Sequence, residues 1–401
     1  MSANHMNLKR ISHRIKEEFG STIEVAKVVG IKGAFATFRG KVDIQIMVHN
    51  GHIEYPRIKK HLMQKHEAMN AYFAKVFTEM TAERIGTLDI PKQDENYKDC
   101  IWICWWQGLG NAPEIVKRCV ASIQKHSGNH KVIMITDENY KEFISFPAWI
   151  EEKYARGIIT KTHLSDLLRI SLLARYGGVW LDSTFFCTGD LEPCFKSPIW
   201  SIKRPDYRHV SVSCGEFANY SFGCTSEYRK VFAILREYLL DYWKQYDYMI
   251  DYLFLDYLIV LARKQNAYVN QAFNEIIPNN KNCDELLKIL GTVYNSEDWE
   301  KLKENTSLFK LTWKINFQKV IRPNPSVTGI PYLYLLEVKY AKASDPADKE
   351  QELMTEARTQ LLQYAADPIV TQSIGTAKLR LITVVFRTWE VVAMEEVEEI
   401  E

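Results

Sequence analysis

The chain has 401 residues, of which 46% are hydrophobic and 25% are charged, with a formal net charge of +1 at pH 7. These values are typical of a globular protein with one large domain and a further part, and the balanced charge gives no reason to expect a nucleic-acid partner for the main domain. The eight cysteines form no paired Cys-x-x-Cys motifs, which argues against a zinc ribbon and favours free thiols in a reducing cytosol. No stretch has the composition of a signal peptide or the length of a membrane span, so we expect a cytoplasmic protein.

Residues 1–97 are expected to form a helical N-terminal region. Apolar residues recur at helical spacing over 15–19 and 58–80, among many Lys, Glu and His residues. The β-branched runs at 23–29 and 41–49 fit either strands or further helix. Because this region holds no catalytic motif, we interpret it as an extension that docks an acceptor or the inner face of a membrane.

A strand, a glycine-containing loop and a helix open the expected catalytic domain, residues 98–318. The strand is Ile101–Trp106, the loop contains Gly108, and Pro113 begins the helix. A loop at a helix N-terminus exposes backbone N–H groups to an anion such as a phosphate. A plain tight turn explains the glycines equally well.

Two further short strands are predicted over 131–137 and 157–160. Asp137 ends the first of them, at the edge where open α/β sheets bind ligands, but we favour a cap of the following helix. Strands that alternate with helices in this order indicate a parallel α/β sheet.

The next helix carries two charged residues of interest. Its apolar face is formed by leucines at helical spacing between 164 and 173, and Thr162 or Ser165 is the expected cap. Asp166 then falls in the first turn, where a carboxylate suits the helix dipole. An ordinary packing unit, in which Asp166 caps the helix and Arg169 pairs with it, is the alternative to a ligand site.

Two glycines and a buried strand follow this helix. Gly177 and Gly178 end the helix, because glycine readily adopts the left-handed conformation of a helix stop. The apolar run 179–181 is typical of a buried strand. Asp182 comes directly after the strand, where its carboxylate would meet solvent and a ligand, and Thr184 stands two positions later.

The later part of the domain offers fewer candidates. Asn219 lies in a predicted turn, which explains an asparagine without any ligand. Asp251 and Asp256 are five positions apart and do not share one helical face; Asp256 is the candidate base or acceptor-hydroxyl ligand, and Asp251 fits a helix cap. Strands are predicted over 199–202, 210–214 and 308–313, and an amphipathic helix over 227–243.

The tail, residues 322–401, has a different character. A Pro-Asn-Pro-Ser linker at 323–326 precedes an apolar strand that carries Glu337 and Lys339. Alternate residues of a strand share one face, so these two side chains lie side by side. A helix with Gln360 and a strand over 379–386 follow. An ordinary edge strand with a Glu-Lys pair is the alternative.

Two motifs carry a family resemblance. Ser-Asp-Leu-Leu-Arg at 165–169 and Tyr-Gly-Gly-Val-Trp-Leu-Asp-Ser-Thr at 176–184 resemble the signature of glycosyltransferases with a DXD-type motif. The nearest relatives resemble capsular polysaccharide synthesis proteins and the family 32 sugar transferases. The resemblance covers about residues 1–316, and its specific part is 100–260. It implies an α/β, GT-A-like nucleotide-sugar-binding fold with a helical N-terminal extension and a small α+β C-terminal tail.

The resemblance also implies roles for individual residues. Asp182 and Asp256 are the implied catalytic residues, and Asp182 with Thr184 would hold Mn²⁺ or Mg²⁺ on the diphosphate. A neutral hydroxyl is a poorer ligand than a carboxylate for these hard cations, so a metal would be held mainly by Asp182, phosphate, water and a residue from elsewhere in the chain. The implied donor-binding residues are Trp102, Trp106, Gly108, Asp166, Arg169, Gly177, Gly178 and Asn219.

The tail resembles the C-terminal part of PD-(D/E)XK nuclease domains, in which a glutamate and a lysine on one strand bind metal and position water. Glu337, Lys339 and Gln360 are the matching residues. The preceding strand that should supply the aspartate of the motif is missing. We therefore interpret the tail as a truncated, inactive nuclease-like remnant.

Together these patterns predict a bacterial, hexosyltransferase-like enzyme. It would move a sugar from a nucleotide-sugar donor to a growing surface or capsular polysaccharide, or to another glycan or lipid-linked acceptor. Its expected location is cytoplasmic, with peripheral association to the inner face of the membrane as an option. The alternatives are a metal-dependent nuclease, which would use the tail, and a non-catalytic sugar-binding protein.

Overall fold

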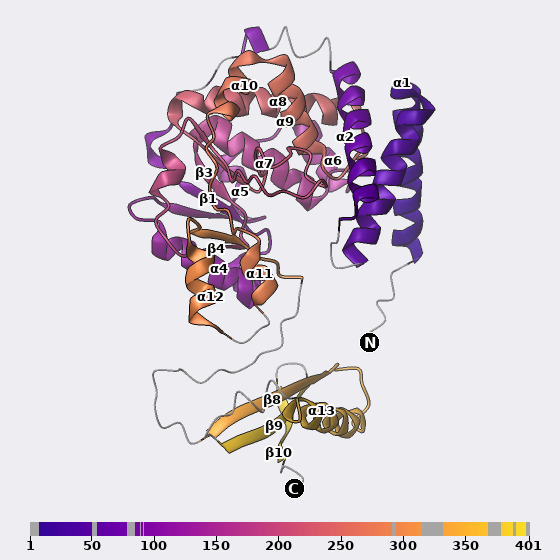
Figure 1. The fold of residues 1–401 in the computed structure, drawn as a ribbon, viewed down its shortest axis with the longest axis vertical. Helices are drawn as coiled ribbons and strands as arrows, with labels where there is room; N and C mark the ends of the chain where they lie inside the picture. The colour runs from indigo at the N-terminus through magenta and orange to yellow at the C-terminus, as the bar shows by residue number, and fades with distance from the viewer. Residues whose placement is uncertain are drawn as a thin grey trace. The chain divides into compact units, whose positions relative to one another are not determined.

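The computed structural model describes residues 8–49, 54–77, 85–88, 90, 92–290, 294–314, 332–367, 378–387 and 390–397. The chain divides into two compact units (Figure 1). The first unit comprises Met1–Ile289 with Val293–Lys314, and the second comprises Leu290–Thr292 with Ile315–Glu401. The predicted linker at 323–326 lies outside the described residues.

A five-stranded sheet lies at the centre of the first unit, with the strand order β2-β1-β3-β6-β5. β1 pairs in parallel with β2 and β3, whereas β6 runs antiparallel to β3 and β5. The strands are β1 (Ile101–Cys104), β2 (Val132–Ile135), β3 (Gly178–Leu181), β5 (Ile199–Trp200) and β6 (Ser221–Cys224). The predicted α/β class is confirmed, but the sheet is mixed. An antiparallel strand needs no helical crossover, and no α-helix separates β5 from β6.

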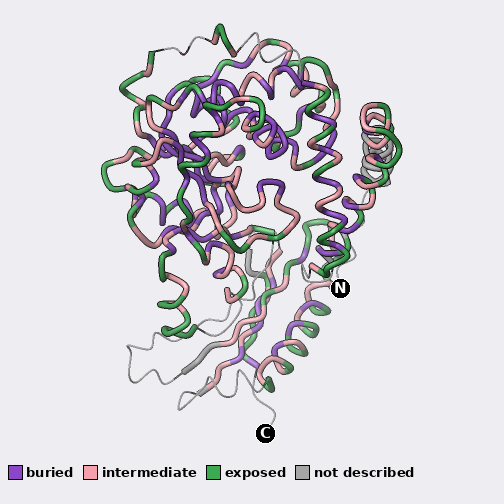
Figure 2. Tube along the Cα trace, turned by 45° about the horizontal axis from the view of Figure 1, so that its top comes forward, coloured by how far each residue is buried: buried purple, intermediate pink, exposed green. Residues whose placement is uncertain are grey.

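Alternating side chains of the strands feed two cores on the opposite faces of this sheet. Trp102 and Trp180 point into the core that is shared with the helices α7, α8 and α9. Their neighbours Ile101 and Val179 point into the other core, together with α4. Figure 2 shows these buried segments as the dense interior of the first unit.

The helices of the first unit surround the sheet. The α-helices after β1 are α4 (Glu114–His126), α5 (Tyr140–Phe143), α6 (Ala148–Ala155), α7 (Lys161–Tyr176), α8 (Arg229–Gln245), α9 (Phe254–Gln265), α10 (Ala267–Asn274), α11 (Glu285–Ile289) and α12 (Ser296–Lys303). Short 3-10 turns lie at Glu95–Tyr97, Leu109–Asn111, Glu192–Phe195 and Ser226–Tyr228. The predicted helix over 227–243 is confirmed as α8, which begins two residues later.

The turn between α7 and β3 requires its two glycines. Both have positive φ, +69° at Gly177 and +81° at Gly178. A Cβ atom on Gly178 would lie 2.3 Å from the backbone oxygen of Cys100. The helix begins at Lys161, capped by Thr160, whose side chain accepts from the N–H of His163 at 3.5 Å. The cap predicted at Thr162 or Ser165 is therefore wrong, because the helix starts before both.

A two-stranded antiparallel ribbon lies beside the exit of β3. It pairs β4 (Phe185–Cys187) with β7 (Leu308–Lys310), and Phe185 lies opposite Lys310 in the register. The strand predicted over 308–313 is thus confirmed in its first half. Because β4 begins three residues after Asp182, this pairing brings residue 310 next to the end of β3.

Three local predictions are wrong. Residues 157–160 form a turn that leads into α7, since Gly157 has φ +74° and Ile159 is buried without a strand partner. Residues 210–214 are also turns rather than a strand, and the chain reverses there through positive φ at Cys214. Asp137 does not cap a helix; it pairs with Lys161 and accepts from the Tyr154 hydroxyl at 3.4 Å.

The N-terminal region is helical and belongs to the first unit. Helices α1 (Leu8–His49) and α2 (Pro56–Val76) lie side by side (Figure 1), and the runs at 23–29 and 41–49 are both helix. Helix α2 packs against α9, where Lys65 forms a buried ion pair of 2.7 Å with Asp251 and donates to the Tyr257 hydroxyl at 2.8 Å. In the described part of the chain, no helix combines the length and apolar character that a bilayer crossing needs.

The second unit is a small sheet with one covering helix. The sheet has the order β10-β9-β8, with β8 parallel to β9 and β9 antiparallel to β10. Apolar side chains of the helix α13 pack on the sheet, for example Leu361 on Leu381. The elements are β8 (Tyr332–Ala341), α13 (Lys349–Ala365), β9 (Lys378–Arg387) and β10 (Glu390–Val397).

Candidate functional site

Charged and polar side chains from four segments meet at the carboxyl end of β3. Helix α7 supplies Asp166 and Arg169, and Asp182 follows β3. Asn219 precedes β6, and Asp256 lies in the first turn of α9. We call these five residues the α7–β3 cluster. Its members are spread over 91 positions of the chain, so only the folded sheet brings them together.

Arg169 is the centre of the cluster. Its side chain is buried, and the residue is 6% exposed. The guanidinium lies 3.2 Å from the carboxylate of Asp166 and 3.8 Å from that of Asp182. It also donates to the backbone oxygen of Asn219 and, at 3.3 Å, to its side-chain oxygen. The planar group lies 5.4 Å from the centre of the Trp180 ring. Arg169 thus connects three of the predicted residues.

Asn219 extends the network to Asp256. Its side-chain nitrogen donates to Oδ2 of Asp256 at 2.8 Å, while its oxygens accept from Arg169. The asparagine is therefore more than a turn residue, because it uses both ends of its amide to couple the central cation to a carboxylate on another helix. The predicted grouping of Asn219 with Asp166 and Arg169 agrees with this geometry.

Two carboxyl groups of the cluster have raised pKa values. The pKa of Asp256 is raised to about 7. Burial is the main cause, the charge of the nearby Asp166 adds to it, and the charge of Arg169 opposes it. Burial likewise raises the pKa of Asp166 to about 6, although Arg169 opposes the shift. Asp256 is 9% exposed. A carboxyl with a pKa near neutrality is suited to exchange protons at physiological pH.

Asp182 behaves in the opposite way. Burial alone would raise its pKa, but the charges of Lys310 and Arg169 outweigh burial and hold the pKa below its usual range. The Trp180 indole donates to Oδ1 of Asp182 at 3.1 Å, and the ammonium of Lys310 lies 3.0 Å from Oδ2. The charges of Lys310 and Arg169 thus favour the ionised form of Asp182.

Lys310 contacts the second residue expected to hold a metal. Its ammonium donates to the hydroxyl of Thr184 at 2.6 Å, in addition to its contact with Asp182. No group of three or more His, Cys, Asp or Glu residues with metal-binding geometry occurs within the described ranges. The donor set at this point consists of one carboxylate and one hydroxyl, both already bonded to a lysine. It does not fit Mn²⁺ or Mg²⁺, which favour several oxygen ligands.

Several residues expected to contact the donor are placed elsewhere. The ring of Trp102 is fully buried in the core, and its indole donates to the backbone oxygen of Gly177 at 2.9 Å. Gly177 and Gly178 are buried in the turn before β3, where close packing explains them. A direct donor contact by these three residues is therefore corrected to a structural role. Gly177 and Gly178 were predicted from their place in the motif and Trp102 from its place on the first strand, and neither place reveals whether a residue faces the core or a ligand.

The loop after β1 holds the other two candidates. Trp106 is mostly buried, and its indole donates to Ser165 Oγ at 2.8 Å and to the oxygen of Lys161 at 3.1 Å. This ties the loop to the first turn of α7. Gly108 has φ +74°, and the space around its α-carbon is open. A ligand contact by either residue stays a prediction.

Sequence reasoning missed three neighbours of the cluster. Lys310 is separated from Asp182 by 128 positions and is the last residue of a short, otherwise apolar strand, which offered no signal. Trp180 is part of the motif and stands two positions before Asp182. Because alternate residues of a strand share one face, its contact with Asp182 could have been predicted. Tyr252 is 75% exposed. The pKa of its hydroxyl is raised by desolvation and by the negative charges of Asp166 and Asp182.

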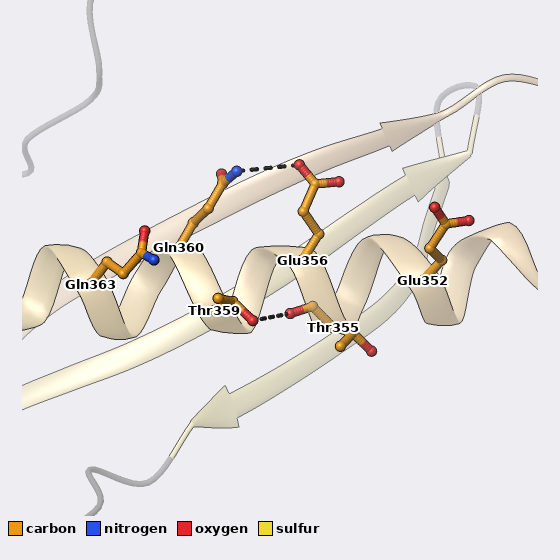
Figure 3. A pocket seen from close by; sticks show the side chains of 6 residues that line it. All are labelled: Glu352, Thr355, Glu356, Thr359, Gln360 and Gln363. Atoms are coloured by element: carbon orange, nitrogen blue, oxygen red, sulfur yellow. Dashed lines mark hydrogen bonds between the residues drawn. The ribbon is translucent and has the colours of Figure 1, made fainter. Parts of the chain in front are cut away.

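The second unit brings the three nuclease-like residues together. The ammonium of Lys339 lies 2.8 Å from Gln360 Oε1, 2.8 Å from Glu356 Oε1 and 3.5 Å from Glu337. Beside them lies a hollow of about 560 Å³ on one face of α13 (Figure 3). It is lined by Glu352, Thr355, Glu356, Thr359, Gln360 and Gln363. The described part of this unit contains no group of three or more His, Cys, Asp or Glu residues that could hold a metal ion, and the inactive, truncated nuclease-like remnant stays a prediction.

Comparisons with known proteins associate the chain with glycosyltransferases. Over 91 residues it is 30% identical to the O-glycosyltransferase PaGT of Phomopsis amygdali. This alignment covers 20% of this chain and 22% of PaGT. The chain thus spans about a fifth of the length of this curated relative. The solved PaToxG glycosyltransferase aligns with 60% of this chain and 95% of its own, at 14% identity. Its TM-score of 0.30 is too low to establish a common fold.

Two family matches cover most of the chain, and both confirm the resemblances found in the sequence. Residues 321–396 match the PD-(D/E)XK nuclease superfamily. Residues 50–325, more than half of the chain, match the capsular polysaccharide synthesis proteins, and this range contains the whole α7–β3 cluster. The chain therefore belongs to the capsular polysaccharide synthesis protein family.

Proposed function

We propose that the protein is a glycosyltransferase that moves a sugar from a nucleotide-sugar donor to a growing surface or capsular polysaccharide, or to another glycan acceptor. The observation that carries this proposal is the α7–β3 cluster, in which one buried arginine joins an ionised carboxylate to two carboxyl groups of raised pKa. Family membership supports the same general activity. A hexose as the transferred sugar and a bacterial source remain expectations.

Each part of the cluster suits one requirement of glycosyl transfer. The leaving nucleoside diphosphate develops negative charge as its bond to the sugar breaks, and preorganised cations stabilise that charge. Asp256 is a suitable base for the acceptor hydroxyl because its pKa is near 7. Asp166, when protonated or ionised, is suited to hydrogen-bond a sugar hydroxyl. Tyr252, an exposed aromatic residue near the same carboxylates, is a candidate for the acceptor side.

The alternatives receive less support. A non-catalytic sugar-binding protein would not require a buried carboxyl with a pKa near neutrality, which burial makes unfavourable in its ionised form. A nuclease would need a set of acidic metal ligands around Glu337, and the described residues of the second unit contain no group of three or more His, Cys, Asp or Glu residues that could hold a metal ion.

A panel of UDP-, GDP- and CMP-sugars tests the proposal. We expect release of the nucleotide from one donor, with and without added divalent ions, and loss of that release in Asp256→Asn. Glu275→Gln, an exposed carboxylate at the end of α10, is the matched control. If the folded protein neither binds nor turns over any donor of the panel, the proposal is wrong.

We further propose that helix α1 docks the protein on an anionic membrane surface, where a lipid-linked acceptor would be presented. The helix has buried apolar residues, including Ala34 and Met47, and also an exposed apolar stripe. This outer stripe of α1 consists of Ile31, Phe35, Phe38, Val42 and Ile46. The helix contains eight Lys or Arg residues against four Asp or Glu residues. An apolar stripe on a basic helix suits the interface of an anionic bilayer.

Vesicle co-sedimentation tests this membrane proposal. Binding should be stronger to phosphatidylglycerol vesicles than to phosphatidylcholine vesicles, and it should weaken at least tenfold in the triple variant Ile31→Ser, Phe35→Ser, Phe38→Ser. Ile277→Ser, which removes an exposed apolar residue elsewhere, is the control. Equal binding of the triple variant and the control would contradict the proposal.

A further inference from the structure

Lys310 occupies the position where a divalent ion would have to sit between Asp182 and Thr184. Its Nζ lies 3.0 Å from Oδ2 of Asp182 and 2.6 Å from Oγ1 of Thr184. These are the first and third positions of the DXD-like motif. Mg²⁺ requires its oxygen ligands at about 2.0–2.1 Å, so it cannot share these two oxygens with an ammonium group.

The position of Lys310 is determined by the backbone around it. Its residue pairs with Phe185 in the β4–β7 ribbon, and its N–H donates to the oxygen of Cys283 at 2.8 Å. The next residue, Leu311, donates to the oxygen of Thr184 at 2.9 Å. The ammonium then lies near two aromatic rings, with Nζ 5.5 Å from the centre of Phe185 and 5.3 Å from that of Tyr220. A long and otherwise flexible side chain is thereby preorganised.

The local charges match one lysine better than one divalent ion. Threonine at position 184 leaves Asp182 as the one carboxylate of the motif, and Lys310 balances its single negative charge. Oδ1 of Asp182 is also engaged, by the Trp180 indole at 3.1 Å and by Arg169 at 3.8 Å. A divalent ion would therefore have to displace the ammonium and remain beside a second cation, which is electrostatically unfavourable.

We propose that the ammonium of Lys310, held by Asp182 and Thr184, stabilises the diphosphate leaving group and makes transfer independent of a divalent metal. This inference rests on the proposed glycosyltransferase function. In the reaction, the bond between the anomeric carbon and the diphosphate oxygen breaks, and its electron pair stays on that oxygen, to which Lys310 donates a hydrogen bond. The acceptor oxygen forms the new bond to the anomeric carbon, and its proton passes to the carboxylate of Asp256. Lys310 thus supplies the positive charge that a metal would otherwise provide.

The first experiment compares turnover of the active donor in EDTA with turnover in Mn²⁺ and in Mg²⁺. The wild-type protein should have the same kcat in all three conditions, within about twofold. Lys310→Met should lower kcat by about 100-fold, the loss expected for one oxyanion-stabilising group, with a smaller change in KM. Lys310→Arg should retain a substantial part of the activity, because it keeps the charge. The control Lys314→Met removes an exposed lysine four positions later and should leave kcat unchanged.

Nucleotide binding by the wild-type protein keeps the inference falsifiable if Lys310→Met is merely unstable, and a second variant tests the exchange of lysine for metal. The double variant Thr184→Asp, Lys310→Met restores a DXD motif and removes the competing cation. We expect it to regain turnover that depends on Mn²⁺, and isothermal titration should detect tighter binding of the nucleoside diphosphate with Mn²⁺ than with EDTA. Wild-type protein should bind the nucleotide equally well in both conditions.

The outcomes separate this inference from the proposed function. If the wild-type protein turns over a donor only when a divalent ion is present, or if Lys310→Met is as active as Lys314→Met, the inference is wrong and the glycosyltransferase function stands. If the wild-type protein turns over no donor in any condition, the proposed function itself is wrong.

Discussion

Each unit of the protein holds a lysine among oxygen atoms, and the surroundings of the two lysines differ. Lys310 lies beside the buried α7–β3 cluster, whose Asp166 and Asp256 have raised pKa values. Lys339 lies beside the carboxylates of Glu337 and Glu356, and the side chain of Glu356 is 50% exposed. The hydrogen bond from Lys339 lowers the pKa of Glu356. A lysine–carboxylate contact is therefore not by itself a sign of function.

The difference between the two regions is burial and convergence. The residues of the α7–β3 cluster come from two helices, a strand exit and a loop, and water is largely excluded from Arg169 and Asp256. Charges interact strongly in such a place, and proton affinities shift. The residues around Lys339 come from one strand and one helix, and solvent screens the contact with Glu356, which is half exposed. We therefore expect the same kind of substitution to change stability or activity more in the α7–β3 cluster than around Lys339.

The largest expected effect is the loss of a buried ion pair. Arg169→Met should lower the free energy of unfolding by about 3–5 kcal/mol, because it leaves Asp166 buried without its ion-pair partner and removes one of the two cations beside Asp182. Arg358→Met, which breaks an exposed pair of 3.3 Å with Glu395, should cost less than about 1 kcal/mol. Urea denaturation followed by tryptophan fluorescence and circular dichroism measures both. Similar losses in the two variants would contradict the distinction between the regions.

The next effect concerns catalysis. Asp256→Asn should lower kcat by about 10²–10³-fold, because the amide cannot accept a proton, while the contact with Asn219 can be kept. Glu356→Gln makes the same chemical change in the second unit and should leave transfer unchanged. If both variants retain full kcat, another group must act as the base.

The smallest effect is a dependence of stability on pH. The pKa of Asp256 is raised from 3.8 to about 7 by folding, so the folded state holds a proton that the unfolded state has lost between these values. The contribution of this proton to the free energy of unfolding is fully present below about pH 4, and it declines as the pH rises toward 7. In Asp256→Asn the decline between pH 5 and 7 should be shallower by up to about 1 kcal/mol per pH unit. Identical slopes in the two proteins, measured by urea denaturation, would show that Asp256 is not the titrating group.

The activity of the wild-type protein should respond to pH in the opposite direction. Asp256 must be ionised to accept a proton, so kcat should rise as the pH increases through about 7. Because Asp166 also titrates near this range and interacts with Asp256, the apparent pKa belongs to the pair. A kcat that falls over pH 6–8 would argue against Asp256 as the base.

Local patterns in the sequence were sufficient for much of the fold. The helix α7, its glycine stop and the buried strand β3 were predicted because apolar spacing and glycine chemistry act over a few residues. Asp166 and Arg169 are three positions apart on this helix, so their contact also follows from local geometry. The predictions failed where local signals misled. The β-branched residues at 157–160 suggested a strand, but Ile158 and Ile159 are packed against the core in a turn.

What the sequence alone determined is thus the set of elements and the short motif at their junction, since both depend on contacts between near neighbours. The tertiary structure alone decided that Asn219 links Arg169 to Asp256, that Trp102 faces the core, and that Lys310 lies against Asp182. These facts depend on the register of β4 with β7 and on the packing of α9, which act across up to 128 positions of the chain. The cation beside the motif is therefore a property of strand pairing, because the residues of the motif contain no information about which distant side chain will face them.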